Sequence, residues 1–209
     1  MEKTMSHPTY HTLPEEQAIF IPLLCSLDSL LARKRPIIIA IDGGSASGKS
    51  SLAALLARLY ECNVLHMDDF FLQMHQRTPE RFAEPGGNVD YERFRAEVLE
   101  PLAARKPFSY RPFSCKTMSL APPVDVTPGQ LTIVEGAYSM HPSLSGFYDY
   151  SVFLKTSEET QAQRILLRNG PQMQKRFLSE WIPMEQLYFR HFGIENRCDL
   201  CLCTDHLDL

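Results

Sequence analysis

One eight-residue run constrains the fold of this chain more than any other feature: Gly43-Gly44-Ser45-Ala46-Ser47-Gly48-Lys49-Ser50. It follows a short β-branched run, Ile37 to Ile41, which is typical of a buried parallel strand. It precedes a segment in which leucines recur at three- and four-residue steps, as in an amphipathic helix. Strand, glycine-rich loop and helix are the context in which the pattern G-x-x-x-x-G-K-[ST] binds phosphate. The alternative is a glycine-rich turn that holds no ligand.

The residue types in this run suit a polyphosphate. Glycines allow backbone conformations that side chains forbid, so successive N–H groups can surround a phosphate at the start of a helix. Lys49 is long enough to reach the β- and γ-phosphates of ATP and is a predicted catalytic residue, and the Ser50 hydroxyl can bind Mg²⁺. The loop residues expected to bind ATP are Gly43, Gly44, Ser45, Ala46, Ser47, Gly48, Lys49, Ser50 and Ser51.

The bulk composition is that of an ordinary soluble protein, and 209 residues suffice for one α/β domain with a full core. A net charge of −4, without a long basic run, gives no reason to expect nucleic acid or an anionic membrane as a partner. The start of the chain lacks the layout of a signal peptide, and no apolar run is long enough to span a bilayer. We expect a cytoplasmic protein.

A pair of acids follows the second predicted strand, Val64 to Met67. In open α/β sheets ligands bind beyond the carboxyl ends of the strands, so Asp68 and Asp69 lie where a substrate is expected. A carboxylate there can accept the proton of an attacking hydroxyl. Asp68, the first residue past the strand, is the predicted base. The alternative is that the acidic pair merely caps the next turn.

Another carboxylate, Glu135, stands at the carboxyl end of the third predicted strand, Leu131 to Gly136. An acid in this place can hold Mg²⁺ or one of its waters. A buried glutamate without a partner would be costly, which favours this interpretation. We therefore expect Ser50 and Glu135 to form a Mg²⁺ site.

The composition changes between the second and third strands. Residues 73–88 are polar, with prolines and glycines, and predict a long surface loop able to fold over a ligand. Asp90 then begins a helix, for which an aspartate is a natural N-cap. Residues 107–128 hold five of the fifteen prolines and predict short strands and turns at the active edge of the sheet. Their aromatic side chains suit either a wall that stacks a flat ring or a small satellite core.

Two arginines one turn apart, Arg164 and Arg168, lie on the helix predicted after the fourth strand. Together with Lys175 and Arg176 they form a basic cluster that can close on ATP and offset charge on the transferred phosphoryl group. The alternative is a solvated basic face. We expect a lid at residues 164–176 in which both arginines bind ATP and Arg168 takes part in catalysis.

The order and spacing of these residues resemble the uridine kinase branch of the P-loop small-molecule kinases, which also includes phosphoribulokinase, bacterial pantothenate kinase and nicotinamide riboside kinase. The resemblance extends from about Pro36 to Asp205. It rests on Gly-Gly-Ser-Ala-Ser-Gly-Lys-Ser at 43–50, Met-Asp-Asp-Phe-Phe at 67–71, Asn-Val-Asp at 88–90, Tyr110, Val-Glu-Gly at 134–136 and Leu-Arg-Asn at 167–169.

The resemblance implies a role for each matching position. Asp68 would be the base, Asp90 would hold the ribose hydroxyls, Tyr110 would line the nucleoside pocket and Glu135 would serve the Mg²⁺ site. Arg164 and Arg168 would belong to the lid. The substrate-binding residues expected on this basis are Asp68, Phe71, Asp90, Tyr110, Phe113 and Cys115.

Two positions depart from the uridine kinase pattern. Uridine kinases have a Tyr where this chain has Phe71, and a base-reading His about where Cys115 stands. Losing both polar groups should weaken recognition of the pyrimidine edge, because such specificity comes from matched hydrogen bonds. The acceptor therefore stays open between a nucleoside, pantothenate, nicotinamide riboside and a sugar phosphate. An acceptor phosphate would need further cations, for which Arg81, Arg111 and Lys116 are candidates.

A protein that binds a nucleotide without turnover is the alternative from another class. Asp68, Asp90 and Glu135 together count against it, because a pure binder has no need for a base and an acceptor clamp. The sequence leaves open the choice between ATP and GTP as donor, the regulation and whether the chain forms homo-oligomers.

The sequence thus predicts a single P-loop NTPase-type α/β domain over residues 1–209, with a doubly wound parallel sheet of about five strands flanked by helices. Residues 12–35 are a predicted helical cover, 73–128 a substrate-side excursion and 164–176 the lid. The predicted reaction transfers the γ-phosphoryl group of Mg·ATP to a primary hydroxyl of a nucleoside-like small molecule, with ATP and Mg²⁺ as cofactors.

Overall fold

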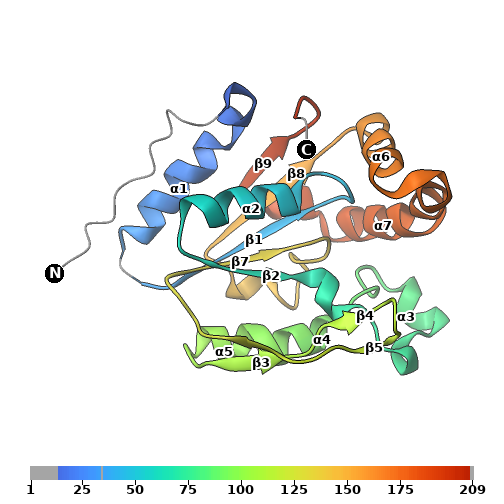
Figure 1. Cartoon of the computed structure of the whole chain (residues 1–209), viewed down its shortest axis with the longest axis horizontal. Coiled ribbons are helices and arrows are strands. Elements are labelled where there is room, and N and C mark those ends of the chain that lie inside the picture. Colours follow the sequence, from blue (N-terminus) through green and yellow to red (C-terminus); the bar gives the residue numbers. More distant parts are fainter. Residues whose placement is uncertain (1–13, 34, 208–209) are drawn as a thin grey trace.

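A five-stranded parallel sheet forms the centre of the computed structural model, which describes residues 14–33 and 35–207 (Figure 1). The strand order is β2-β7-β1-β8-β9, and every neighbouring pair runs parallel. This confirms the predicted sheet. The strands are β1 (Ile37–Gly43), β2 (Asn63–His66), β7 (Leu131–Glu135), β8 (Tyr150–Lys155) and β9 (Leu200–Cys203).

Strand β1 lies in the middle and is buried along its whole length. Successive side chains of a strand point to opposite faces, so its isoleucines supply both cores. Ile39 and Ile41 belong to one cluster, and Ile38 and Ala40 to the other. A β-branched apolar run is what a strand covered on both faces needs.

Helices α1 (Ile21–Leu31) and α2 (Lys49–Leu59) cover the first face, as Figure 1 shows. A 3₁₀-helix, η2 (Glu15–Phe20), precedes α1. Pro22 lies in the first turn of α1, where its missing N–H needs no partner. The predicted cover thus contacts the core through Phe20 of η2 and through α1, while residues 12, 13 and 34 of that range lie outside the described residues.

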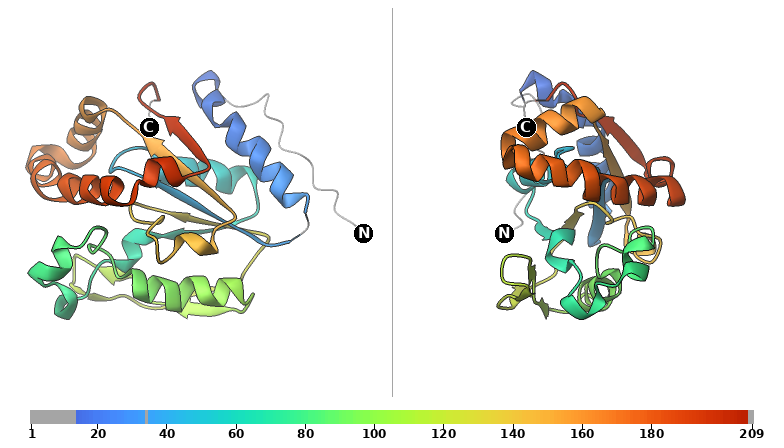
Figure 2. Two further views of the ribbon diagram at one scale, coloured as in Figure 1. Left: turned by 180° about the vertical axis from the view of Figure 1, so that it is seen from behind. Right: turned by 90° about the vertical axis from the view of Figure 1, so that its right-hand side faces the viewer.

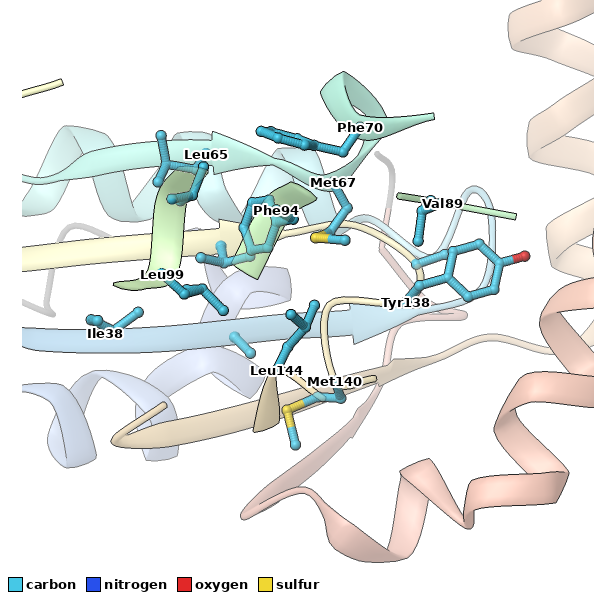
Figure 3. Packing of buried hydrophobic residues seen from close by; sticks show 14 of the residues in the cluster. Ile38, Leu65, Met67, Phe70, Val89, Phe94, Leu99, Tyr138, Met140 and Leu144 are labelled. Atoms are coloured by element: carbon cyan, nitrogen blue, oxygen red, sulfur yellow. The ribbon is translucent and has the colours of Figure 1, made fainter. Parts of the chain in front are cut away.

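The segment from residue 67 to 126 covers the opposite face. Figure 3 shows Phe94 and Leu99 packed between this segment and the central strands. Its elements are η3 (Met67–Phe70), η4 (Met74–Gln76), α3 (Pro79–Ala83), α4 (Tyr91–Phe94), the π-helical η5 (Arg95–Leu99), α5 (Glu100–Ala103), β3 (Phe108–Tyr110), β4 (Phe113–Ser114), β5 (Ser119–Leu120) and β6 (Val124–Val126).

The long loop predicted at residues 73–88 contains two short helices, η4 and α3. Thr78 caps α3 by accepting a hydrogen bond from the N–H of Arg81, and Pro79 occupies the first helical position. A cap followed by proline is a helix-start signal, so the surface loop predicted from composition includes short helices that composition did not indicate.

The C-terminal part contains η6 (Ser145–Phe147), α6 (Glu158–Arg176), the π-helical η7 (Phe177–Trp181), α7 (Ile182–Phe192) and α8 (Ile194–Arg197). Figures 1 and 2 show α6 and α7 side by side at one end of the sheet. Gly170, with φ of 76° and ψ of 171°, interrupts α6 just before Pro171. Within the described residues, none of the helices combines the length and apolar character that crossing a membrane requires.

We predict that the Leu24→Ala substitution lowers the free energy of unfolding by about 2–5 kcal/mol, because it leaves a cavity in the core under α1. Leu24 is fully buried, whereas Ile21 on the same helix is 38% exposed. Urea unfolding of Leu24→Ala beside Ile21→Ala measures the difference. Equal losses in the two variants would contradict the packing of α1 on the sheet.

Candidate functional site

The loop between β1 and α2 has the backbone of an anion-binding turn. Gly43, Ala46 and Gly48 have φ values of 145°, 59° and 94°. A Cβ on Gly43 would collide with the carbonyl oxygen of Leu154, so only glycine fits there. Residues with positive φ in a loop let neighbouring N–H groups point to one side and form a concavity for an anion.

Lys49 is buried at the start of α2, and its ammonium is held by the loop itself. Nζ donates to the carbonyl oxygens of Gly43 and Gly44 at 2.9 and 2.8 Å. The hydroxyl of Ser47 is buried in the same loop without a hydrogen-bond partner among the described residues. A cation and an orphaned hydroxyl beside an anion-binding turn fit a polyphosphate ligand.

Glu135, at the end of β7, faces the loop. Its Oε1 accepts a hydrogen bond from the Ser50 hydroxyl at 3.1 Å and lies 2.6 Å from His66 Nδ1. Burial acts to raise the pKa of Glu135, but the His66 contact, the charge of Lys49 and the Ser50 bond together lower it. An ionised carboxylate beside a hydroxyl is an oxygen donor set suited to Mg²⁺.

Asp68 and Asp69 follow β2 within η3 and have different surroundings. The Asp68 side chain is exposed at the surface. Partial desolvation by the surrounding chain raises the pKa of its carboxyl, and the positive charge of Lys49 acts in the opposite direction. The carboxylate of Asp69 instead accepts a hydrogen bond from the Tyr110 hydroxyl at 2.9 Å. His66 occupies the N-cap position of η3 and makes no side-chain cap hydrogen bond, so neither acid of the pair is the N-cap of this turn.

Asp90 does cap a helix. Its Oδ1 accepts from the N–H of Arg93 at 3.0 Å, and its Oδ2 accepts from Gln76 Nε2 at 2.8 Å. The Arg93 guanidinium lies 3.6 Å from the same carboxylate. The cap alternative is therefore present in the structure, and any role toward an acceptor comes in addition to it.

The other residues expected at the acceptor are spread over the excursion. Tyr110 and Phe113 are buried, and the Tyr110 ring stacks on Phe70 with centroids 5.2 Å apart. Tyr110 and Phe70 belong to the main core cluster on this face of the sheet, so the Tyr110 ring is part of that core and not of a small satellite core. The Phe71 backbone pairs with Val89, whereas Cys115 is exposed in the turn between β4 and β5.

The two arginines predicted for the lid have different surroundings. Arg164 donates to the carbonyl oxygens of Thr204 and Leu207 at 2.6 and 2.7 Å and to that of Ala46 at 3.3 Å. It thus ties the phosphate loop to the segment after β9. Arg168 is exposed and donates to the neighbouring Asn169 side chain at 2.8 Å.

Sequence reasoning missed several polar residues that contact the loop. Glu185 on α7 accepts hydrogen bonds from the N–H and hydroxyl of Ser45 at 2.9 and 2.5 Å. Gln161 on α6 donates to the Ser45 carbonyl oxygen at 2.8 Å. Asp42, which accepts from the Gly43 N–H, directly precedes the loop, and His66, which contacts Glu135 and not the loop, lies two positions before Asp68. Both could have been found from these positions in the sequence. Gln161 and Glu185 lie 116 and 140 positions from Ser45, beyond any local pattern.

A cavity of about 540 Å³ opens on the α7 side of the loop. Its lining includes Gly44, Lys155, Gln161, Arg190 and Glu195. The lining does not include Asp68, Asp90 or Glu135, so this cavity is separate from the predicted acceptor site.

We predict that His66 titrates above its ordinary pKa of 6.5, because Glu135 stabilises its charged form. A raised folded-state pKa means that the charged His66 stabilises the fold below about pH 6.5, a contribution lost as the pH rises through the raised value. NMR titration of the imidazole measures the pKa, and Glu135→Gln should lower it. An unchanged pKa in that variant would refute the pairing.

The sequence matches no family model and no curated protein significantly. A solved structure described as a possible uridine kinase from Bacillus stearothermophilus is similar, with a TM-score of 0.62 and 20% identity over 87% of this chain and 99% of that chain.

Two further solved structures are less similar. TT1252 from Thermus thermophilus has a TM-score of 0.44 and 21% identity over 81% of this chain and 88% of that chain. A shikimate kinase from Bacteroides thetaiotaomicron has a TM-score of 0.44 and 14% identity over 83% and 89%. Neither adds to the argument at this TM-score. The first similarity and the sheet order together establish that the chain has the α/β fold of the P-loop kinases.

Proposed function

We propose that this chain is an ATP-dependent small-molecule kinase that transfers the γ-phosphoryl group of Mg·ATP to a primary hydroxyl of a nucleoside-like acceptor. One observation carries the proposal: Lys49 and Asp68 come after the carboxyl ends of β1 and β2, and Glu135 is the last residue of β7, the strand between them. The charge of Lys49 acts on both carboxyl groups, which supports their meeting at one site. Ligands of open α/β sheets bind at this edge.

The loop between β1 and α2 and the residues beside it would bind and orient ATP, the phosphoryl donor. The N–H groups of residues 44, 46 and 48–50 would surround its phosphates, and Lys49 would exchange its loop carbonyls for phosphate oxygens. Ser50 and Glu135 would hold Mg²⁺, which when bound neutralises charge on the phosphoryl group. His66 would have to release the Glu135 oxygen that it contacts, or share it.

Asp68 would act as the general base. Its carboxylate takes the proton of the acceptor hydroxyl as that oxygen bonds to phosphorus and the bond to the departing ADP oxygen breaks. The pKa of Asp68 is raised toward neutral pH, and a general base is most effective when its pKa lies near the pH at which the enzyme works. Arg168, as an exposed lid residue, would reach the transferred group only after movement of the lid.

The acceptor side favours a neutral, hydroxyl-bearing molecule. Two of the three cations considered for an acceptor phosphate are engaged within the chain: Arg81 forms paired hydrogen bonds with Glu92 at 2.7 and 2.6 Å. Arg111 donates to the carbonyl oxygens of Leu120 and Ala121. Because a carboxylate can accept about four hydrogen bonds, Asp90 retains capacity for ribose hydroxyls. This supports a nucleoside-like acceptor over a sugar phosphate.

We predict that ADP release from Mg·ATP depends on the acceptor and falls by about 10²–10⁴-fold in Asp68→Asn, because the amide cannot take the hydroxyl proton. The assay runs wild-type protein against a panel of nucleosides, pantothenate, nicotinamide riboside and sugar phosphates. The acceptor that raises turnover identifies the substrate class.

Asp69→Asn provides the matched control, since it makes the same change one residue away at a group bonded to Tyr110. It should retain far more turnover than Asp68→Asn. Equal losses in both variants would remove the assignment of the base to Asp68. Nucleotide binding without turnover for any acceptor would favour the binding-protein alternative.

A further inference from the structure

Ser45 is held from outside the phosphate loop at each of its polar groups. Its N–H and hydroxyl donate to the two carboxylate oxygens of Glu185, and its carbonyl oxygen accepts from the Gln161 amide. Both partners are 4% exposed. A residue bonded at its N–H, hydroxyl and carbonyl by buried groups has its backbone orientation set by those groups.

The two partners stand on either side of the predicted lid. Gln161 lies near the start of α6 and Glu185 near the start of α7, and Figures 1 and 2 show these helices side by side. Ile165 is buried, but beyond it the chain between them is loosely packed: Leu167 is 86% exposed and Leu178 is 48% exposed. Gly170 also breaks the helix there. A loosely packed segment can move, and because it connects Gln161 to Glu185 its movement can be transmitted to both residues.

A buried acid beside a polyphosphate site needs a physical reason. Burial raises the pKa of Glu185, opposed by Lys49 and by the two bonds from Ser45. The carboxylate also repels a bound phosphate, so as a pure filler it would be unfavourable. The 2.5 Å and 2.9 Å bonds to Ser45 are in the range of strong charge-assisted hydrogen bonds. Gln161 donates a hydrogen bond to the carbonyl oxygen of the same residue, so Ser45 is held by two side chains. This favours a role for Glu185 in fixing Ser45 over the alternative that its carboxylate merely occupies the phosphate position.

We propose that Glu185 is a positioning residue that presets the phosphate loop through Ser45 and, with Gln161, couples the loop to the lid. This rests on the proposed function, because it assigns the loop to ATP. Glu185 touches neither donor nor acceptor in this scheme. It acts by keeping Ser45 in the conformation that the nucleotide requires, which reduces the ordering needed on binding.

The test is a double-mutant cycle on the affinity for Mg·ADP, measured by calorimetry. Glu185→Gln places an NH₂ group where one Ser45 donor points and should raise the dissociation constant about tenfold. Ser45→Ala keeps the N–H bond and should cause a smaller rise. The double variant should bind no more weakly than Glu185→Gln alone, because both changes break one interaction. Glu159→Gln, which changes an exposed acid on α6, is the matched control and should bind as wild type does.

Two further measurements separate positioning from a loss of folding. The KM for ATP should rise in Glu185→Gln while the KM for the acceptor does not. Hydrogen exchange should show that Mg·ADP slows amide exchange both in the loop and in residues 162–184 of the wild type, and only in the loop of Glu185→Gln. Equal slowing of residues 162–184 in both proteins would overturn the coupling.

Each outcome decides the proposal. Unchanged or tighter Mg·ADP binding in Glu185→Gln would overturn it, the tighter result showing that Glu185 competes with phosphate. If that variant does not fold, Glu185→Ala in a background of Ser45→Ala takes its place, and wild-type affinity in this double variant would overturn the proposal. Wild-type protein that binds no nucleotide would overturn the proposed function as well, whereas normal turnover with an unaffected Glu185→Gln would overturn this inference alone.

Discussion

The buried carboxylate of Asp42 holds the loop end of the molecule together. It is completely inaccessible to solvent and accepts hydrogen bonds from the N–H of Gly43 at 2.7 Å, the N–H of Met140 at 2.9 Å and the hydroxyl of Tyr188 at 2.8 Å. These donors come from the start of the phosphate loop, from the turn after β7 and from α7. A carboxyl group withdrawn from water needs such partners, and burial accordingly raises the pKa of Asp42.

That single group explains much of the arrangement around it. Tyr188 is fixed by its bond to Asp42, and Glu185 lies three residues earlier on the same face of α7, so it reaches Ser45. The turn after β7 is fixed by the Met140 bond, and it begins directly after Glu135. Gly136 there has a φ of 140° and comes so close to Met67 that a Cβ would lie 2.7 Å from the Met67 Cβ. The end of β7 is therefore packed against η3, which carries Asp68.

The acceptor side is built on packing as much as on polar groups. Asp90, which is buried, caps α4, and Phe94 of the same helix packs with Phe70 and Tyr110 in an aromatic core. The hydroxyl of Tyr110 is directed to Asp69, which leaves Asp68 as the acid that opens to solvent beside Lys49. In our proposal, core residues thus separate two adjacent carboxylates into a structural one and a reactive one.

Local patterns in the sequence determined the central sheet and the phosphate loop, because strand periodicity and the glycine and lysine spacing act over a few residues. They also placed Asp68 and Glu135 at strand ends, and strand order then brought those ends together. Only the tertiary structure decided which partners the loop has. Glu185 and Gln161 meet Ser45 across more than one hundred residues, and Arg164 meets carbonyl oxygens near the end of the chain. Such contacts depend on how the helices pack on the sheet, so they cannot be predicted from residue spacing along the chain.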